Sequence, residues 1–191
     1  MSPPQQEAVI QERILSQRLY LNRPQVVDVP FLHFCVADPQ AHGSYLSAHQ
    51  LTLQEVEVRF QNGFFWNEHS TTFLIKLKKD HSRIGMIHCW DKPEDPSTAM
   101  YAVQIALVDY RNLGYGTEAQ RAVIGALFRQ HHRKVVEVYT DMQNSAEAHT
   151  LKKLGFQLEE STSYLDLDVQ RNGNVFRLRR EVYCQMEAYF E

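Results

Sequence analysis

Hydrophobic positions along the chain recur at two different intervals, which predict two kinds of secondary structure. Period-two alternation and short β-branched or aromatic runs predict strands over residues 18–21, 71–77, 84–90, 101–108, 135–140, 156–169 and 175–189. Apolar residues three and four positions apart predict helices over residues 29–37, 53–61, 117–130 and 144–154. This order predicts an α/β fold, in which a mixed but mostly antiparallel sheet is flanked by helices.

Cap and turn residues mark the ends of these elements. Asp28 and Thr52 are expected to cap the first two helices, because a short side-chain oxygen can accept from free backbone N–H groups. The polar residues 78–82 predict a hairpin between two strands. Residues 170–174 predict a second hairpin, because they contain Asn172-Gly173, a strong turn signal.

The length of 191 residues predicts one domain over residues 17–191, preceded by a flexible arm over residues 1–16 that is rich in Pro, Gln and Glu. The 20 basic and 23 acidic residues nearly balance, so no overall field would attract nucleic acid or an anionic membrane. No apolar segment approaches the length of a membrane span, and a cytoplasmic location is expected.

Cys35, Cys89 and Cys184 are far apart in the sequence. Their odd number and wide spacing argue against a disulfide framework and against a zinc site, and no metal is expected. We expect all three to be reduced, buried thiols.

The strongest candidate for chemistry is the turn Arg111 to Gly116, between a predicted strand and a predicted helix. A helix start leaves backbone N–H groups unpaired at the positive end of its dipole, which suits a phosphate or pyrophosphate. A Gly-x-Gly pair alone is weak evidence, since most such pairs are simple turns. The dinucleotide fingerprint lacks its third glycine, replaced by Ala119, and no Gly-Lys-Ser/Thr phosphate loop is present.

The same turn fits the Gln/Arg-x-x-Gly-x-Gly/Ala signature, and the chain therefore resembles the GNAT N-acetyltransferase superfamily. Residues 144–156, which begin with Asn144 and end in Lys-Leu-Gly-Phe, resemble a second segment of that family. The opening Arg18-Leu19-x-Leu21-x-x-Pro24-x-x-x-Asp28 resembles the RimJ/RimL branch, whose members acetylate ribosomal proteins. The resemblance covers the chain from about residue 18 onward.

The resemblance implies a GNAT fold that binds acetyl-CoA as co-substrate. It implies that one strand segment splays from its neighbour and pairs its backbone with the pantetheine arm, and that the turn holds the pyrophosphate. Asn144 would hydrogen-bond near the pantetheine, although it could equally be only a helix cap. The residues expected to bind the cofactor are Ile105, Ala106, Leu107, Arg111, Asn112, Leu113, Gly114, Tyr115, Gly116, Thr117 and Asn144.

The proton path departs from the family pattern. Many relatives carry a Tyr donor where this chain has Leu151, which cannot donate a proton. Glu147, one turn earlier, could relay a proton through water, but a solvent-facing acid favoured by the helix dipole is the blander interpretation. Tyr101 and His88 are further catalytic candidates, although an aromatic residue and a lone histidine in strands usually serve packing and local hydrogen bonding.

By this resemblance the chain is expected to be an acyl-CoA-dependent N-acyltransferase acting on a protein N-terminus, a polyamine or another small amine, as a monomer or homodimer. A non-catalytic acyl-CoA-binding or scaffold module remains an alternative, because Leu151 removes the usual donor. The acceptor and the acyl group stay open. The aromatic run 64–66 is interpreted as a core plug beneath a loop, or alternatively as one wall of a substrate pocket.

Overall fold

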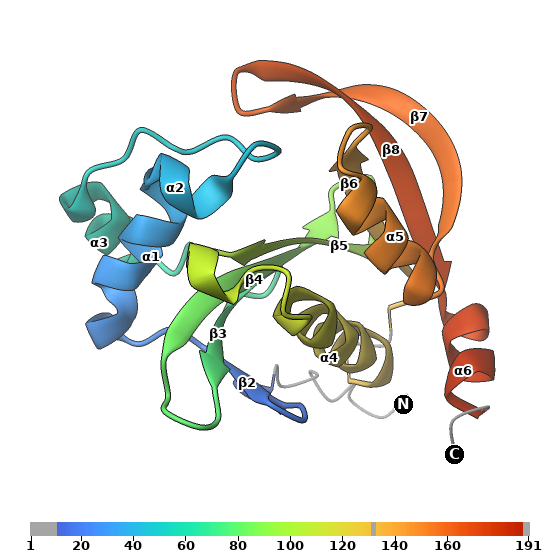
Figure 1. Ribbon diagram of the computed structural model, residues 1–191, viewed down its shortest axis with the longest axis horizontal. Coiled ribbons are helices and arrows are strands. Elements are labelled where there is room, and N and C mark those ends of the chain that lie inside the picture. Colours follow the sequence, from blue (N-terminus) through green and yellow to red (C-terminus); the bar gives the residue numbers. More distant parts are fainter. Residues whose placement is uncertain (1–10, 131–132, 189–191) are drawn as a thin grey trace, which may run out of the picture.

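A computed structural model describes residues 11–130 and 133–188 and shows one sheet covered by helices on both faces (Figure 1). The described strands run in the order β1-β2-β3-β4-β5-β6-β8-β7, and every neighbouring pair is antiparallel except β5 and β6. The strands are β1 (Arg13–Leu15), β2 (Leu19–Asn22), β3 (Ser70–Leu77), β4 (Arg83–Lys92), β5 (Asp95–Ile105), β6 (Val135–Asp141), β7 (Gln157–Asp166) and β8 (Val169–Arg179). The mixed, mostly antiparallel sheet that the sequence predicts is confirmed.

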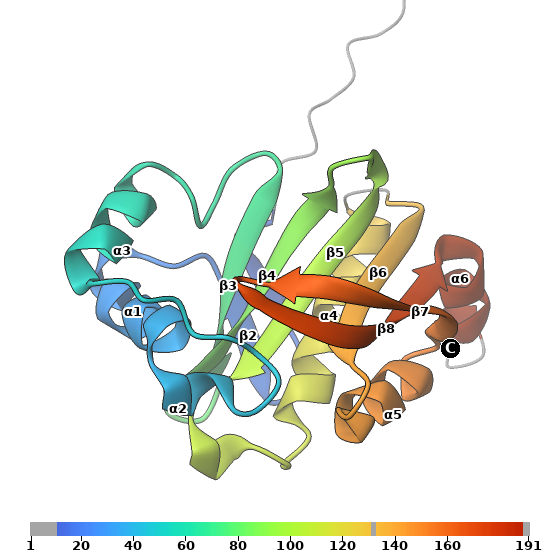
Figure 2. The same ribbon diagram turned by 90° about the horizontal axis from the view of Figure 1, so that it is seen from above.

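The helices divide between the two faces of the sheet (Figure 2). They are α1 (Val29–Ala37), α2 (Pro39–His42), α3 (Leu53–Gln61), α4 (Tyr115–Arg129), α5 (Ser145–Lys153) and α6 (Arg180–Ala188), with short 3-10 turns at Val26–Asp28 and Val108–Tyr110. Apolar residues of α4 and α5, such as Val123 and Leu151, are buried with one face of β3, β4 and β5. Val36 of α1 and Val56 of α3 pack on the other face, against Leu74.

Two predictions at the amino-terminal end are corrected. The predicted arm extends to residue 16, but Arg13–Leu15 forms β1 and pairs with β2, while residues 1–10 of that arm lie outside the described residues. Asp28 does not cap α1: its fully buried carboxylate accepts from the Gln25 N–H at 2.9 Å and forms ion pairs with Lys76 and Arg83. Two cations and a backbone donor compensate for the loss of water around this carboxylate.

The cap predicted at Thr52 is confirmed. Its hydroxyl accepts from the Glu55 N–H, and the Glu55 carboxylate accepts in return from the Thr52 N–H at 2.7 Å, which forms a capping box. Within the following aromatic run Phe65 is buried in the α1–α3 cluster, whereas Phe64 is 49% exposed. None of residues 64–66 lines the cleft described below, so the plug interpretation holds for Phe65 and the pocket-wall alternative fails.

The hairpin turn predicted at residues 170–174 is wrong. The β7–β8 connection lies at residues 167–168, where Leu167 adopts a positive φ of 55°, and Gly173 sits inside β8. A Cβ on Gly173 would lie 2.4 Å from the Tyr164 ring and 2.8 Å from the Thr140 carbonyl oxygen. The glycine therefore permits a close approach across the sheet and does not mark a turn.

Three further boundaries differ from the prediction. The strand predicted over 175–189 ends at Arg179, and the chain continues as α6, whose Tyr183 ring stacks on Phe128. Helix α4 begins at Tyr115, two residues before the expected start, and β5 begins at Asp95, six residues before the expected start.

Cys184 on α6 is exposed, contrary to the expectation of three buried thiols, while Cys35 and Cys89 are buried.

Candidate active site

The two parallel strands of the sheet separate after three residue pairs. β5 and β6 pair only at Thr98–Val135, Ala99–Val136 and Met100–Glu137, after which β5 continues beside β4 and β6 beside β8. Beyond Met100, the edge of β5 has no strand partner on that side within the described residues. The splay expected from the resemblance is therefore present.

The backbone that faces this gap belongs to Ile105, which was expected, and to Val103, which was not. Alternate residues of an antiparallel ladder direct N–H and C=O to opposite sides. Because the Ala106 N–H donates to Ile84, Val103 and Ile105 direct theirs toward β6. The prediction for Ala106 and Leu107 is corrected: both N–H groups donate to the Ile84 carbonyl, at 2.9 and 3.2 Å, and neither is free for a ligand.

The turn before α4 has the geometry of an anion site. Gly114, the residue before the helix, is left-handed with φ 79°, a conformation that glycine adopts without strain. No side chain caps the helix, and its first backbone bond runs from the Glu118 N–H to the Gly114 carbonyl. The N–H groups of Tyr115, Gly116 and Thr117 therefore lie ahead of the first helical bond, at the positive end of the dipole.

Arg111 braces this turn through backbone carbonyls. Its Nε donates to Ile105 at 2.8 Å, and its Nη2 lies 2.6 Å from Gln40, 2.9 Å from Ala41 and 3.1 Å from Ala106. The guanidinium thus ties the end of β5 and the helix α2 to the turn. These contacts engage Nε and Nη2, so Arg111 supports the turn, and its predicted contact with the cofactor stays a prediction.

Arg18 braces the turn from the other side, a role that the sequence did not reveal. Its guanidinium contacts the Glu118 carboxylate at 2.7 Å and the Leu113 carbonyl at 3.1 Å, and lies 4.3 Å from the centre of the Tyr115 ring. The backbone N–H of Arg18 also donates to Glu118 at 2.6 Å. These contacts lower the pKa of the Glu118 carboxyl against the opposing effect of burial, which is the largest single influence. The sequence indicated this segment only as a strand and as part of the family resemblance.

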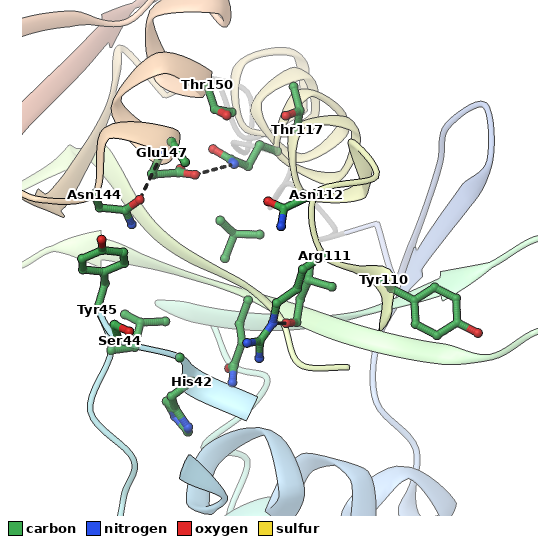
Figure 3. Close-up of a pocket in the computed structure, with 18 of the residues that line it drawn as sticks. His42, Ser44, Tyr45, Tyr110, Arg111, Asn112, Thr117, Asn144, Glu147 and Thr150 are labelled. Carbon is green, nitrogen blue, oxygen red and sulfur yellow. Dashed lines mark hydrogen bonds between the residues drawn. The ribbon is translucent and has the colours of Figure 1, made fainter. Parts of the chain in front are cut away.

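A cleft of about 440 Å³ lies where β5, the turn, α4 and α5 meet (Figure 3). The predicted residues that line it are Ile105, Arg111, Asn112, Gly114, Gly116, Thr117 and Asn144. Ala106, Leu107, Leu113 and Tyr115 do not line it. The Leu113 and Tyr115 side chains are turned to Arg18 and solvent, so only their backbone stands at the turn.

Asn144 caps α5, since its side-chain oxygen accepts from the Glu147 N–H at 3.1 Å. The bland interpretation of this residue is thus confirmed, and its side chain also borders the cleft. The predicted contact of Asn144 with pantetheine stays a prediction.

Glu147 points into the cleft, and the expectation of a solvent-facing side chain is wrong. One carboxylate oxygen, Oε2, lies 3.3 Å from Nε2 of Gln120. The other, Oε1, is buried without a hydrogen-bond partner among the described residues. Burial raises the pKa of this carboxyl, while the Gln120 hydrogen bond opposes the rise.

Gln120 connects Glu147 to Tyr101. The Tyr101 hydroxyl donates to Oε1 of Gln120 at 2.7 Å, which turns the amide nitrogen toward Glu147. Tyr101 is 3% exposed, and burial raises the pKa of its phenol well above the usual value. Two of the three catalytic candidates, Tyr101 and Glu147, therefore belong to one chain of hydrogen bonds. The sequence analysis missed Gln120, because a glutamine in a helix has no sequence signal of its own.

His88 is not brought to this site. Its ring nitrogens lie 2.8 Å from the Thr72 hydroxyl and 3.3 Å from that of Ser70, and the ring stacks between Phe64 and Trp90. Burial lowers the pKa of His88 to about 4. It lines neither the cleft nor the cavity described next, so the local-packing interpretation holds.

A smaller cavity of about 100 Å³ adjoins the cleft between the separated strands and is called the tyrosine cavity. Its lining includes Tyr45, Tyr101, Tyr139, Tyr164, Asp141 and Glu147. Glu147 and Asn144 border both spaces. Glu147 is thus the carboxylate placed at their junction.

Residues 43–52, here called the strap, run from α2 toward the tip of the β7–β8 hairpin (Figures 1 and 2). The Tyr45 hydroxyl donates to the Gln143 carbonyl at 3.2 Å. The backbone and hydroxyl of Ser47 both donate to the Asp166 carboxylate, at 2.9 and 2.8 Å, and Arg171 joins the same cluster. The strap therefore bridges the two sides of the separated strands.

Residues 18–157 match the family model described as an acetyltransferase (GNAT) domain. The chain belongs to the GNAT acetyltransferase family. The match spans β5, the turn, α4 and α5, which are the elements that meet at the cleft. A search of curated protein sequences found no match.

Solved GNAT structures share this fold over most of the chain. An aminoglycoside acetyltransferase in complex with coenzyme A is 16% identical with a TM-score of 0.74, covering 88% of this chain and 99% of its own. RimL, a ribosomal L7/L12 α-N-protein acetyltransferase in complex with coenzyme A, is 17% identical with a TM-score of 0.72, covering 88% and 98%. A GNAT acetyltransferase from Bacillus anthracis is 16% identical with a TM-score of 0.73, covering 88% and 99%.

Two features are absent from the described residues, 11–130 and 133–188. No helix among them is long and apolar enough to cross a membrane. No group of three or more His, Cys, Asp or Glu residues in these ranges is arranged to hold a metal ion.

Proposed function

We propose that this GNAT protein transfers an acetyl group from acetyl-CoA to an amine, with Glu147 as the proton acceptor. The observation that carries the proposal is the position of Glu147 at the junction of the cleft and the tyrosine cavity. RimJ/RimL-like proteins remain the branch that the sequence resembles, and the fold similarity to RimL is consistent with it.

The cleft suits acetyl-CoA in two respects. The unbonded N–H groups at the start of α4 would hold the pyrophosphate, because a helix N-terminus favours an anion. The backbone of Val103 and the N–H of Ile105, whose carbonyl accepts from Arg111, would pair with the amide groups of the pantetheine arm, as an added strand pairs with a sheet edge. In this arrangement the thioester would be directed toward Glu147.

The reaction then needs one proton acceptor and a route for a second proton. Glu147 takes a proton from the ammonium group, directly or through water, and the neutral nitrogen attacks the thioester carbonyl carbon. The carbon–sulfur bond breaks as the tetrahedral intermediate collapses, and the sulfur leaves with the second proton of the nitrogen. The products are the amide and CoA thiol, and Glu147 returns its proton to water.

A non-catalytic CoA-binding module is the second candidate, and one observation favours it. Leu151, at the position of the usual Tyr donor, is fully buried in the core and supplies no proton. Acetyl transfer is still favoured over a binding module, because an enzyme can catalyse the reaction by aligning the two substrates, and positioning alone accounts for much of the rate in many enzymes.

Substitution Gly116→Val tests the binding part of the proposal. A Cβ on Gly116 meets no atom closer than 3.7 Å, so the backbone tolerates it, while the branched side chain occupies the cleft. We expect acetyl-CoA affinity, measured by calorimetry, to fall at least tenfold with an unchanged melting temperature. Arg121→Val on the exposed face of the same helix is the matched control.

Unchanged affinity in Gly116→Val would refute the assignment of the cleft. Release of free CoA thiol with a panel of amines separates the two candidates, because a binding module stabilised by acetyl-CoA would release none.

A further inference from the structure

The tyrosine cavity has a lining that selects the chemistry of its occupant. Four tyrosines line it together with two acidic residues: Tyr45, Tyr101, Tyr139, Tyr164, Asp141 and Glu147. The resemblance gives no acceptor, and the GNAT neighbours act on different amines. The acceptor class is therefore inferred from the charge, the aromatic lining and the size of the cavity.

We propose that the tyrosine cavity binds an alkylammonium group, so that the acceptor is a primary amine at the end of a short, unbranched aliphatic chain. This inference rests on the proposed function and narrows it to a substrate class. The ammonium would lie between the tyrosine rings and the carboxylates, with its nitrogen directed to Glu147.

The charge around the cavity favours a cation. Arg171 contacts Asp166 at 2.7 Å and lies 3.7 Å from Asp141, so one guanidinium faces two carboxylates before Glu147 is counted. Negative charge therefore remains in excess at this end of the gap. An ammonium group would supply the missing positive charge.

The aromatic walls favour an ammonium carried on an alkyl chain. The rings of Tyr139 and Tyr164 have centroids 5.8 Å apart and are inclined by 60°, so they pack against each other, and both residues line the cavity. Tyr164 rests on Gly173, where any side chain would displace the ring. Aromatic faces attract ammonium through the ring quadrupole and also cover apolar methylene groups.

The size of the cavity and its cover favour a thin acceptor. A volume of about 100 Å³ matches roughly three or four water molecules, at about 30 Å³ each, or a chain of a few methylenes. The strap, bonded to Asp166 through Ser47, closes one approach to this space. A folded protein surface would meet the strap, whereas a slender amine would pass beside it.

Binding of n-butylammonium, measured by calorimetry with saturating CoA, tests the proposal independently of turnover. We expect it to bind at least tenfold more tightly than n-butanol, which has the same shape without the charge. Tyr164→Ala should weaken n-butylammonium about fivefold, the loss expected for one partly exposed cation–π contact. Tyr164→Phe is the matched control, because it keeps the ring and should bind as the parent protein does.

A second variant, Asp141→Asn, keeps the acceptor for the Gln143 N–H and removes only the charge. It should weaken n-butylammonium but not n-butanol, and neither variant should alter acetyl-CoA affinity. Equal binding of the two ligands, or an unaffected Tyr164→Ala, would overturn the proposal.

Turnover separates this proposal from the proposed function. n-Butylamine and 1,4-diaminobutane should release CoA thiol faster than a tripeptide with amino-terminal alanine. A preference for the tripeptide would overturn the substrate class while leaving acetyl transfer intact. Selective n-butylammonium binding without thiol release from any amine would leave the cavity assignment standing and refute transfer.

Discussion

Replacing Arg111 by alanine should lower the stability of the protein. The main effect should be the loss of hydrogen bonds to backbone carbonyls, and the loss of a direct contact with the ligand should matter less. The guanidinium approaches four carbonyl groups, from Gln40, Ala41, Ile105 and Ala106, and its Nη2 has two hydrogens for three of them. At most three full hydrogen bonds are therefore lost. At about 1.5 kcal/mol each, the lower end of the range for charged donors, this corresponds to about 4 to 5 kcal/mol. For a chain of this length we expect the melting temperature to fall by about 10 °C.

Thermal unfolding of Arg111→Ala, with and without acetyl-CoA, measures this effect. Acetyl-CoA affinity should fall as well, because the turn and α2 lose their common brace, and saturating ligand should restore part of the stability. Arg111→Lys should resemble the alanine variant, since a single ammonium cannot reach both α2 and β5 as the planar fork does. Exposed Arg121→Ala is the control and should change neither quantity.

A contrary result would be informative about the ligand. If Arg111→Ala melts within about 2 °C of the parent protein, less than about 1 kcal/mol has been lost. If it also loses acetyl-CoA binding, and Arg111→Lys retains it, the charge of Arg111 acts on the ligand directly. The supporting role argued from the four carbonyl contacts would then be wrong.

Two further substitutions test the site and the fold. Glu147→Gln should lower kcat by about 10² to 10⁴ without changing acetyl-CoA affinity, and should remove the rise of activity with pH that deprotonation of Glu147 gives the parent enzyme. Burial raises the pKa of Glu147 in the folded state above its value in the unfolded state. The stability of the parent protein relative to this variant is therefore greatest below the unfolded-state pKa and declines as the pH rises through the folded-state pKa. Urea unfolding at pH 4 and pH 8 measures this difference in stability. A kcat within threefold of the parent would exclude Glu147 as the proton acceptor. Asp28→Asn leaves Lys76 and Arg83 without their buried carboxylate and should cost about 3 to 5 kcal/mol in denaturant unfolding at pH 7, whereas a loss below about 1 kcal/mol would mean that solvent compensates the two cations.

The geometry of the turn before α4 could be predicted from sequence because it depends on local backbone conformation. Two glycines at a strand–helix junction determine the free N–H groups, whatever packs around them. Helices and strands with clear periodicity, such as α3 and β6, were predicted for the same reason. Their cap residues and apolar spacing act over one or two turns of chain.

The sequence-based predictions are wrong where the role of a residue is determined by contacts with residues distant in the sequence. Asn172-Gly173 has the composition of a hairpin turn, yet Gly173 is required by the Tyr164 ring and the Thr140 carbonyl across the sheet. Asp28 has the composition of a helix cap, yet its charge is compensated by residues of β3 and β4. At such positions the sequence indicates that a residue has a structural role. Only the tertiary contacts decide whether that role is a local turn or cap or a long-range contact.

Glu147 shows how this limit affects the functional assignment. An acid in the first turn of a helix satisfies the dipole rule in solvent or in a cleft, so the local rule cannot separate the two. The fold decides, because α5 lies over the gap between β5 and β6 and turns this carboxylate toward Gln120. The same tertiary contact explains why Gln120 has no signal in the sequence.

The unpartnered Oε1 of Glu147 is the strongest argument that this arrangement serves chemistry. Leaving a buried acceptor without a hydrogen bond costs about 1 to 3 kcal/mol, and capping of α5 does not need it because Asn144 supplies the cap. A carboxylate already saturated by donors would have a lowered pKa and little tendency to take a proton. The Glu147 carboxyl has a raised pKa and lines both spaces, so it can accept a proton from an amine that arrives through the tyrosine cavity. The energetic cost to the fold and the requirement of the reaction thus coincide at one atom.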